Sequence, residues 1–187
     1  MAEHVCPVWV GYLLASPLRK LTQNPHKILT PHVREGMTVL DIGCAMGFFS
    51  LPAARLVGAE GKVICIDLQE KMLNSLRQRA AKAGLTDRIE TRLCPKDTLK
   101  IDDLAQSIDF ALAFALVHEV PDAKKLFSEI HAALKPSAKL LIAEPKGRIS
   151  EEHFNASLFS AQHSGFEIID RPCIARSHAA LISKKNL

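Results

Sequence analysis

The chain has 187 residues, of which 48% are hydrophobic and 24% are charged. This length fits one domain with a small appendage, and the ordinary composition excludes a disordered or low-complexity protein. The 24 basic and 20 acidic residues leave a net charge of +4 and are interspersed, so charge alone gives no reason to expect a nucleic-acid partner.

Residues 1–35 precede the regular alternation of the chain and predict an N-terminal helical cap or lid. The apolar run at 8–18 has no basic residue before it, which argues against a signal peptide. No segment reaches the roughly 18 apolar residues needed to span a bilayer. Pro25 suits the first turn of a short helix. We therefore expect a cytoplasmic protein with no membrane segment.

Strand and helix patterns alternate through residues 36–187, which we expect to form one domain. Strands are expected at 37–42, 62–67, 88–93, 108–114, 138–143 and 166–170, and helices at about 48–58, 69–83, 122–134 and 150–164, with β character again at 173–183. Gly84 and Gly165 suit positions just after helix ends, and Lys135-Pro136 is expected to close the third helix. This alternation predicts an α/β domain with a parallel sheet covered on both faces.

The first strand and its loop are the most informative segment. The strand ends at Asp41, and glycines follow at Gly43 and Gly47. The second strand ends at another acid, Asp67, which is typical of a nucleotide-binding βαβ unit whose acid holds ribose hydroxyls. The loop differs from the G-x-G-x-x-G of dinucleotide sites. Asp41 suits an ammonium group better than a phosphate, because like charges repel.

Residues 39–47 resemble motif I of the class I S-adenosylmethionine-dependent methyltransferases of the small-molecule type, and the resemblance continues almost to the C-terminus. It implies a three-layer Rossmann-like, doubly wound sheet of seven strands, ordered 3-2-1-4-5-7-6, with the last strand antiparallel. It also implies S-adenosyl-L-methionine as the cofactor, at the carboxyl ends of the strands. The family usually has glycine at Ala45, so we expect the methionine moiety to be slightly displaced.

The resemblance implies a set of cofactor-binding residues that follow the strands: Asp41, Gly43, Cys44, Gly47, Asp67, Leu68, Met72 and Phe114. The two oxygens of Asp67 can each accept a hydrogen bond from one ribose hydroxyl. Leu68 and Met72 stand where the family sandwiches the purine, although both also suit a core. Pro95 occupies the position of a common adenine-binding acid, and Asp97 comes two residues later. Either the loop is reshaped or a backbone group holds the adenine.

His118 and Glu119 follow the fourth strand in a turn that resembles those of small-molecule methyltransferases, and the resemblance places them over the sulfonium. They are the candidate catalytic residues. A histidine there can take a proton from the acceptor, or it can simply hold the loop by hydrogen bonding. Pro121-Asp122 suits the start of the next helix. Glu144, at the end of the fifth strand, is expected either to orient the substrate or to cap a neighbouring element.

Several motifs are absent after the fourth strand. The chain has no Asn- or Asp-Pro-Pro-aromatic tetrapeptide, no Pro-Cys nucleophile and no acidic set for a catechol-binding magnesium, so we expect no metal and no transfer to adenine or glutamine amines or to pyrimidine carbons. Trp9 and Tyr12 are the single tryptophan and tyrosine of the chain. We expect them either to shape the acceptor pocket or to pack against the sheet.

The predicted function is direct in-line methyl transfer to a small molecule by a monomer or homodimer. An RNA methyltransferase would need a basic face. A thiol- or arsenic-directed enzyme would need Cys6, Cys44, Cys94 and Cys173 to converge, whereas the odd, scattered cysteines suit free thiols in a reducing compartment. A non-catalytic S-adenosylmethionine-binding module remains open because of Ala45 and Pro95.

Overall fold

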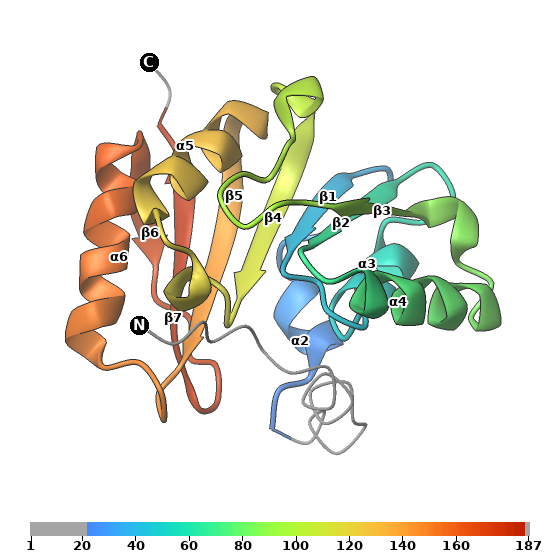
Figure 1. Cartoon of the computed structure of the whole chain (residues 1–187), viewed down its shortest axis with the longest axis horizontal. Helices are drawn as coiled ribbons and strands as arrows, with labels where there is room; N and C mark the ends of the chain where they lie inside the picture. The colour runs from blue at the N-terminus through green and yellow to red at the C-terminus, as the bar shows by residue number, and fades with distance from the viewer. Residues whose placement is uncertain (1–21, 186–187) are drawn as a thin grey trace.

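A mixed sheet in the order β3-β2-β1-β4-β5-β7-β6 forms the centre of the protein (Figure 1). The structure is a computed structural model and describes residues 22–185. The strands are β1 (Thr38–Ile42), β2 (Lys62–Asp67), β3 (Ile89–Leu93), β4 (Ile108–Phe114), β5 (Leu134–Pro145), β6 (Phe166–Asp170) and β7 (Ser177–Lys184). The α-helices are α2 (Pro25–Leu29), α3 (Ser50–Leu56), α4 (Glu70–Lys82), α5 (Ala123–Ala133) and α6 (Glu151–His163).

The strand directions confirm the predicted sheet. β1 pairs in parallel with β2 and β4, and the parallel pairing continues to β3 and β5. β7 runs antiparallel to both β5 and β6. The order of the strands reverses between β1 and β4, so a ligand site is expected at the carboxyl ends of these two strands.

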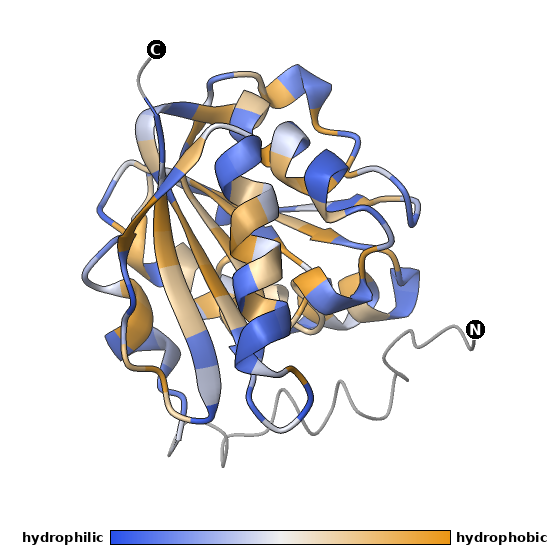
Figure 2. Cartoon of the chain, turned by 90° about the vertical axis from the view of Figure 1, so that its left-hand side faces the viewer, coloured by the Kyte–Doolittle hydropathy of each residue, from blue (hydrophilic) through white to orange (hydrophobic). Residues whose placement is uncertain are grey.

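Each face of the sheet has its own hydrophobic cluster, because successive side chains of a strand point to opposite faces. Leu40 of β1 packs in a cluster with Phe127 of α5 and Phe154 of α6. Val39 packs in the other cluster with residues of α2, α3 and α4, among them Leu73. Figure 2 shows mainly hydrophobic strands, with hydrophilic residues on the helices and loops around them.

The observed elements agree with the predicted ones to within about two residues, except at β5 and at the start of β7, which is Ser177 and not residue 173. We expected Lys135-Pro136 to close a helix and the strand to begin at residue 138, but α5 ends at Ala133 and β5 begins at Leu134. Ile108 pairs with Leu134, whereas Phe110 pairs with Lys139, so the strand carries an irregularity there. Proline is tolerated in a sheet at such a bulge because no ladder hydrogen bond is needed from it.

The predicted roles of Gly84, Gly165, Pro25 and Asp122 at helix ends are confirmed. Gly84 and Gly165 follow the C-cap residues of α4 and α6 with φ of 66° and 92°, a left-handed conformation that glycine adopts at low cost. Pro25 lies in the first turn of α2, which Asn24 caps. Asp122 caps α5, and its carboxylate accepts a hydrogen bond from the Lys125 N–H.

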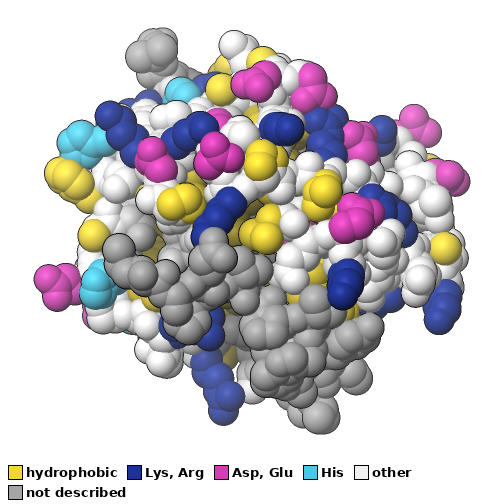
Figure 3. All heavy atoms as spheres, in the orientation of Figure 1, with side chains coloured by type: hydrophobic (Ala, Val, Ile, Leu, Met, Phe, Trp, Pro, Cys, Tyr) yellow, Lys and Arg dark blue, Asp and Glu magenta, His cyan; other side chains and the backbone are white. Residues whose placement is uncertain are grey.

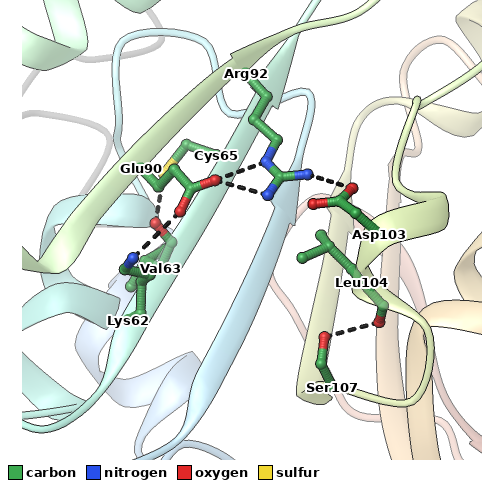
Figure 4. A network of polar contacts seen from close by, with 8 residues as sticks. All are labelled: Lys62, Val63, Cys65, Glu90, Arg92, Asp103, Leu104 and Ser107. Atoms are coloured by element: carbon green, nitrogen blue, oxygen red, sulfur yellow. Dashed lines mark hydrogen bonds and ion pairs between the residues drawn. The ribbon is translucent and has the colours of Figure 1, made fainter.

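The edge strand β3 is protected by charged side chains (Figure 4). Arg92 contacts Glu90 and Asp103 at 2.7 Å each, and Lys62 of β2 contacts Glu90 at 3.3 Å. Surface ion pairs contribute little to stability, but charges on an edge strand disfavour pairing with another chain.

Of the predicted cap at 1–35, residues 22–35 are described, and they pack onto the domain. Leu29 and Val33 are buried in the same cluster as α3. Gln23 Nε2 donates to the Ala175 carbonyl and to Ser177 Oγ, at 3.0 Å each. Trp9 and Tyr12 lie outside the described residues, so their predicted roles stay predictions. Within residues 22–185, none of the helices has the length and apolar character to cross a bilayer.

Candidate active site

A cavity of about 1010 Å³ opens at the carboxyl ends of the central strands, as the sheet topology predicts. Residues that follow β1, β2, β3 and β4 line it, together with parts of the loops after β5 and before β7. Its lining contains most of the predicted site residues, namely Asp41, Gly43, Cys44, Asp67, Leu68, Met72, Phe114, His118 and Glu119. Gly47 and Glu144 do not line the cavity, although residues next to them in the sequence do.

The two motif glycines are required by backbone conformation and by close packing. Gly43 has φ of 71°, and a Cβ added there would lie 2.8 Å from Leu116 Cδ1. Gly47 has φ of 83°, and a Cβ there would lie 2.3 Å from Leu76 Cδ1. Gly43 therefore lets the β1 loop approach the β4 loop, and Gly47 lets it approach α4.

The backbone conformation of Ala45 explains why the family usually has glycine at this position. Its φ is 47°, in the left-handed region, which costs an alanine roughly 1–2 kcal/mol. Its N–H donates to Asp67 Oδ2 at 2.9 Å. The alanine therefore tolerates a strained conformation that points its amide at the acid of the next strand, a contact that the sequence did not predict.

Asp67 ties the cofactor loop to the start of α4. The residue is 8% exposed, and its Oδ1 accepts a hydrogen bond from the Gln69 N–H at 2.8 Å. Burial raises the pKa of Asp67, while the N–H donors of Gln69 and Ala45 oppose that rise. Each carboxylate oxygen has a second lone pair, so both can still accept a ribose hydroxyl.

Asp41 is buried beneath the glycine loop. Its Oδ2 accepts a hydrogen bond from Ser50 Oγ at 2.5 Å, a contact that sequence reasoning missed. Burial raises the pKa of Asp41 to about 6, although the Ser50 hydrogen bond opposes the rise and the nearby Asp67 adds to it. A cationic ligand group next to Asp41 would compensate this buried charge, which fits the ammonium group of the predicted cofactor.

We expect the ligand-free protein to lose stability as the pH rises from about 4 to about 6. The folded pKa of Asp41 lies above its unfolded value of 3.8, so the native state binds more protons in this window. Asp41→Asn keeps an acceptor for Ser50 without the charge. Urea unfolding should show this variant more stable than wild type at pH 7.5 by up to about 2–3 kcal/mol, with a smaller difference at pH 4.5.

The exposed Asp87→Asn serves as the matched control, because it removes one carboxylate from the surface. The same Asp41→Asn protein should bind S-adenosylmethionine more weakly, since the partner of the ammonium group is lost. A stabilisation by Asp41→Asn that is equal at both pH values would show that the buried charge is not its cause.

Glu144 organises the turn that follows β4. It is 1% exposed, and its Oε1 accepts hydrogen bonds from the N–H groups of Leu116 at 3.1 Å and Val117 at 2.7 Å. These bonds cap the short 3₁₀ helix η4 (Val117–Glu119). Its other oxygen is hydrogen-bonded to His118 Nδ1. Glu144 was expected either to orient the substrate or to cap a neighbouring element, and these contacts are those of a capping residue.

The hydrogen bond to Glu144 orients the His118 ring. With the proton on Nδ1, the ring leaves Nε2 as an acceptor. Nε2 lies 3.5 Å from Arg148 Nη1 and 3.8 Å from Glu119 Oε1. Burial raises the pKa of Glu119, while His118 and Arg148 oppose the rise. His118 and Glu119 thus form a polar group with Arg148 on the wall of the cavity.

The loop after β3 lies along the same cavity. Cys94, Pro95 and Asp97 all contribute to its lining, so the structure brings the predicted adenine region to the cofactor loop. Leu68, 37% exposed, and Met72, which is buried, both line the cavity. Apolar side chains of this kind suit the flat face of a purine.

The cysteines do not converge. Cys44 and Cys94 line the main cavity, whereas Cys173 lines a separate cavity of about 190 Å³, and Cys6 lies outside the described residues. Burial raises the pKa of Cys94 to about 11 and raises that of Cys44, so both thiols stay protonated near neutral pH. No group of three His, Cys, Asp or Glu side chains among residues 22–185 could hold a metal ion.

The residues present fit S-adenosylmethionine. The cavity is at the upper end of the usual range for small-molecule sites, about 300–1,000 Å³. The carboxylates of Asp41 and Asp67, which both line the cavity, suit an ammonium group and a ribose.

Comparisons with known proteins show the family of the chain. Residues 33–179 match the family described as "Methyltransferase domain". A ubiquinone/menaquinone biosynthesis C-methyltransferase from Marinomonas sp. is 33% identical over 133 residues, which cover 71% of this chain and 51% of that protein. An arsenite methyltransferase from Halobacterium salinarum is 29% identical over 109 residues, which cover 58% of this chain and 27% of that protein. The chain therefore spans about half or less of the length of these curated relatives.

The fold has a close counterpart among solved structures. The crystal structure of a SAM-dependent methyltransferase from Aquifex aeolicus superposes with a TM-score of 0.83 at 24% identity, covering 96% of this chain and 98% of that one. The family match spans most of the chain, from before β1 into β7. The chain therefore belongs to the methyltransferase domain family and has the class I fold of its S-adenosylmethionine-dependent members.

Proposed function

We propose that the protein transfers the methyl group of S-adenosylmethionine directly to a small-molecule acceptor. The observation that carries this proposal is one continuous cavity, which joins the cofactor loop of β1 to the oriented His118. When bound, S-adenosylmethionine supplies an electrophilic methyl group on a sulfonium. The protein's own contribution is then to position the acceptor and to exclude water.

In this proposal His118 takes the proton that the acceptor loses. Glu144 accepts a hydrogen bond from the Nδ1–H group of His118, so Nε2 is the ring nitrogen that can accept the proton. The Leu116 and Val117 amides hold Glu144 in place, which fixes the ring through a buried carboxylate. A purely structural histidine remains the alternative, and the two are separated by the last experiment in the Discussion.

The relatives support a small-molecule acceptor. The Marinomonas protein is named for C-methylation in ubiquinone and menaquinone biosynthesis, so its acceptor is a small molecule. An RNA acceptor would need a uniformly basic surface, whereas Figure 3 shows Lys and Arg interspersed with Asp and Glu on the face it presents. The dispersed cysteines give no support for an arsenic acceptor, despite the similarity to the Halobacterium enzyme.

Calorimetry tests the cofactor assignment. We expect S-adenosylmethionine and its demethylated product, S-adenosylhomocysteine, to bind, and NAD to show no comparable binding. The acids Asp41 and Asp67 and the Gly43-to-Gly47 spacing are the physical reason. Tight NAD binding without a response to either adenosyl ligand would overturn the assignment.

Methyl-labelled S-adenosylmethionine and a metabolite extract test the reaction itself. We expect label to appear in a small-molecule fraction in the presence of the purified protein. If S-adenosylmethionine binds but label appears only in an RNA fraction or in no fraction, the cofactor assignment stands and the small-molecule proposal is overturned.

A further inference from the structure

Two arginines lie on the wall of the cavity beyond His118. Arg148 comes from the loop after β5, and Arg176 comes from the loop before β7. A hydrogen bond from the Lys146 N–H to the Arg176 carbonyl, 3.0 Å long, joins the two loops. Residues 28 positions apart in the sequence thereby line the same cavity as the cofactor loop.

Neither guanidinium is held in a close ion pair by the described residues. Arg148 has a side chain that is 63% exposed, and the nearest carboxylate oxygen, Glu119 Oε1, is 3.8 Å away. Arg176 is exposed and makes no ion pair with another residue of the range 22–185. The neighbouring Glu144 is already engaged by two amides and by His118. Both guanidinium groups therefore retain donors for a ligand.

A guanidinium presents a planar fork of donors that matches a carboxylate or phosphate. We infer that the methyl acceptor carries such an anionic group, which Arg148 and Arg176 bind while the reacting atom lies near His118. This inference rests on the proposed function and names the chemical class of its acceptor. The contact between Arg148 and Glu119 is 3.8 Å long, so an anionic ligand can replace it.

The inference is tested by binding of model anions to the full chain saturated with S-adenosylhomocysteine. The probes are benzoate, phenyl phosphate and the neutral benzamide, titrated by ligand-observed NMR. We expect at least one anion to bind about tenfold or more tightly than benzamide, since hydrogen bonds between two charged groups are stronger than those to a neutral amide. Which anion binds more tightly distinguishes a carboxylate from a phosphate acceptor.

The double variant Arg148→Gln/Arg176→Gln should lose this preference, and Arg55→Gln should retain it. Arg55 is an exposed arginine on α3, outside the cavity lining, so it controls for the loss of a positive charge. Both substituted arginines are exposed, so we expect the variant to fold and to bind S-adenosylhomocysteine as wild type does. Each single variant gives the same test if the double variant does not fold.

Two results would overturn the inference. One is that the wild type binds benzamide and both anions with equal affinity, or binds none of the three probes. This result can be obtained without any variant. The other is an anion preference that survives in the arginine variants. Failure of the proposed function is a different outcome, because it appears first as a lack of binding of S-adenosylhomocysteine to the wild type.

Discussion

Asp67→Ala should weaken the binding of S-adenosylmethionine by roughly 2–3 kcal/mol, or about 30-fold to 150-fold, because charge-assisted hydrogen bonds to the ribose are lost. Asp67 stands at the end of β2 and lines the cavity beside Leu68. Asp67 directly precedes Leu68, one of the two apolar side chains proposed to contact the purine. Calorimetry with S-adenosylmethionine measures the effect.

The structure adds a second consequence of this substitution. The sequence alone suggests that an acid at a strand tip has little structural duty, but Asp67 is buried and accepts hydrogen bonds from Ala45 and Gln69. The alanine variant leaves those two N–H groups without their acceptor, so thermal unfolding should show a loss of stability as well. Asp67→Asn, which retains one acceptor oxygen, should lose less stability than Asp67→Ala.

Asp170→Ala is the matched control, because Asp170 is an exposed acid at the end of the edge strand β6. It should leave cofactor affinity unchanged. If Asp67→Ala binds S-adenosylmethionine as tightly as wild type does, Asp67 is not the ribose ligand.

Much of the fold could be predicted because local sequence determines it. Helix ends at Gly84 and Gly165 follow from the backbone conformation that each position needs. The start of β5 could not be predicted, because Pro136 is a local signal for a helix end while the pairing of Leu134 with Ile108 is a long-range contact. The strand order itself came from the family resemblance, since periodicity does not specify which strands are neighbours.

The candidate site divides in the same way. Acids at the ends of parallel strands meet at one edge of the sheet, so Asp41 and Asp67 could be placed from the sequence. The partners of Glu144 could not, because they lie 26 to 28 residues earlier in the chain. Arg148 and Arg176 belong to no motif, and it is the pairing of β5 with β7, together with the hydrogen bond between their loops, that brings them to the cavity.

His118→Asn should slow turnover by at least about tenfold, and loss of a general base typically costs ~10²–10⁴ in rate. Asparagine retains some hydrogen bonding but cannot accept a proton near neutral pH. Cofactor affinity should stay unchanged, since the contacts of His118 are with Glu119, Glu144 and Arg148 rather than with the glycine loop. Single-turnover rates with the identified acceptor and calorimetry with S-adenosylmethionine measure the two quantities.

The exposed His163→Asn, at the end of α6, is the matched control and should leave turnover unchanged. Glu144→Gln separates a base from a structural histidine. Its amide N–H can donate to Nδ1, and the tautomer that keeps Nε2 as the acceptor is then no longer selected. Under the base hypothesis this variant slows turnover and changes the pH dependence of kcat, which a purely structural role would leave unchanged. Turnover of His118→Asn equal to that of wild type would refute the base and leave a histidine that holds the β4 loop to β5.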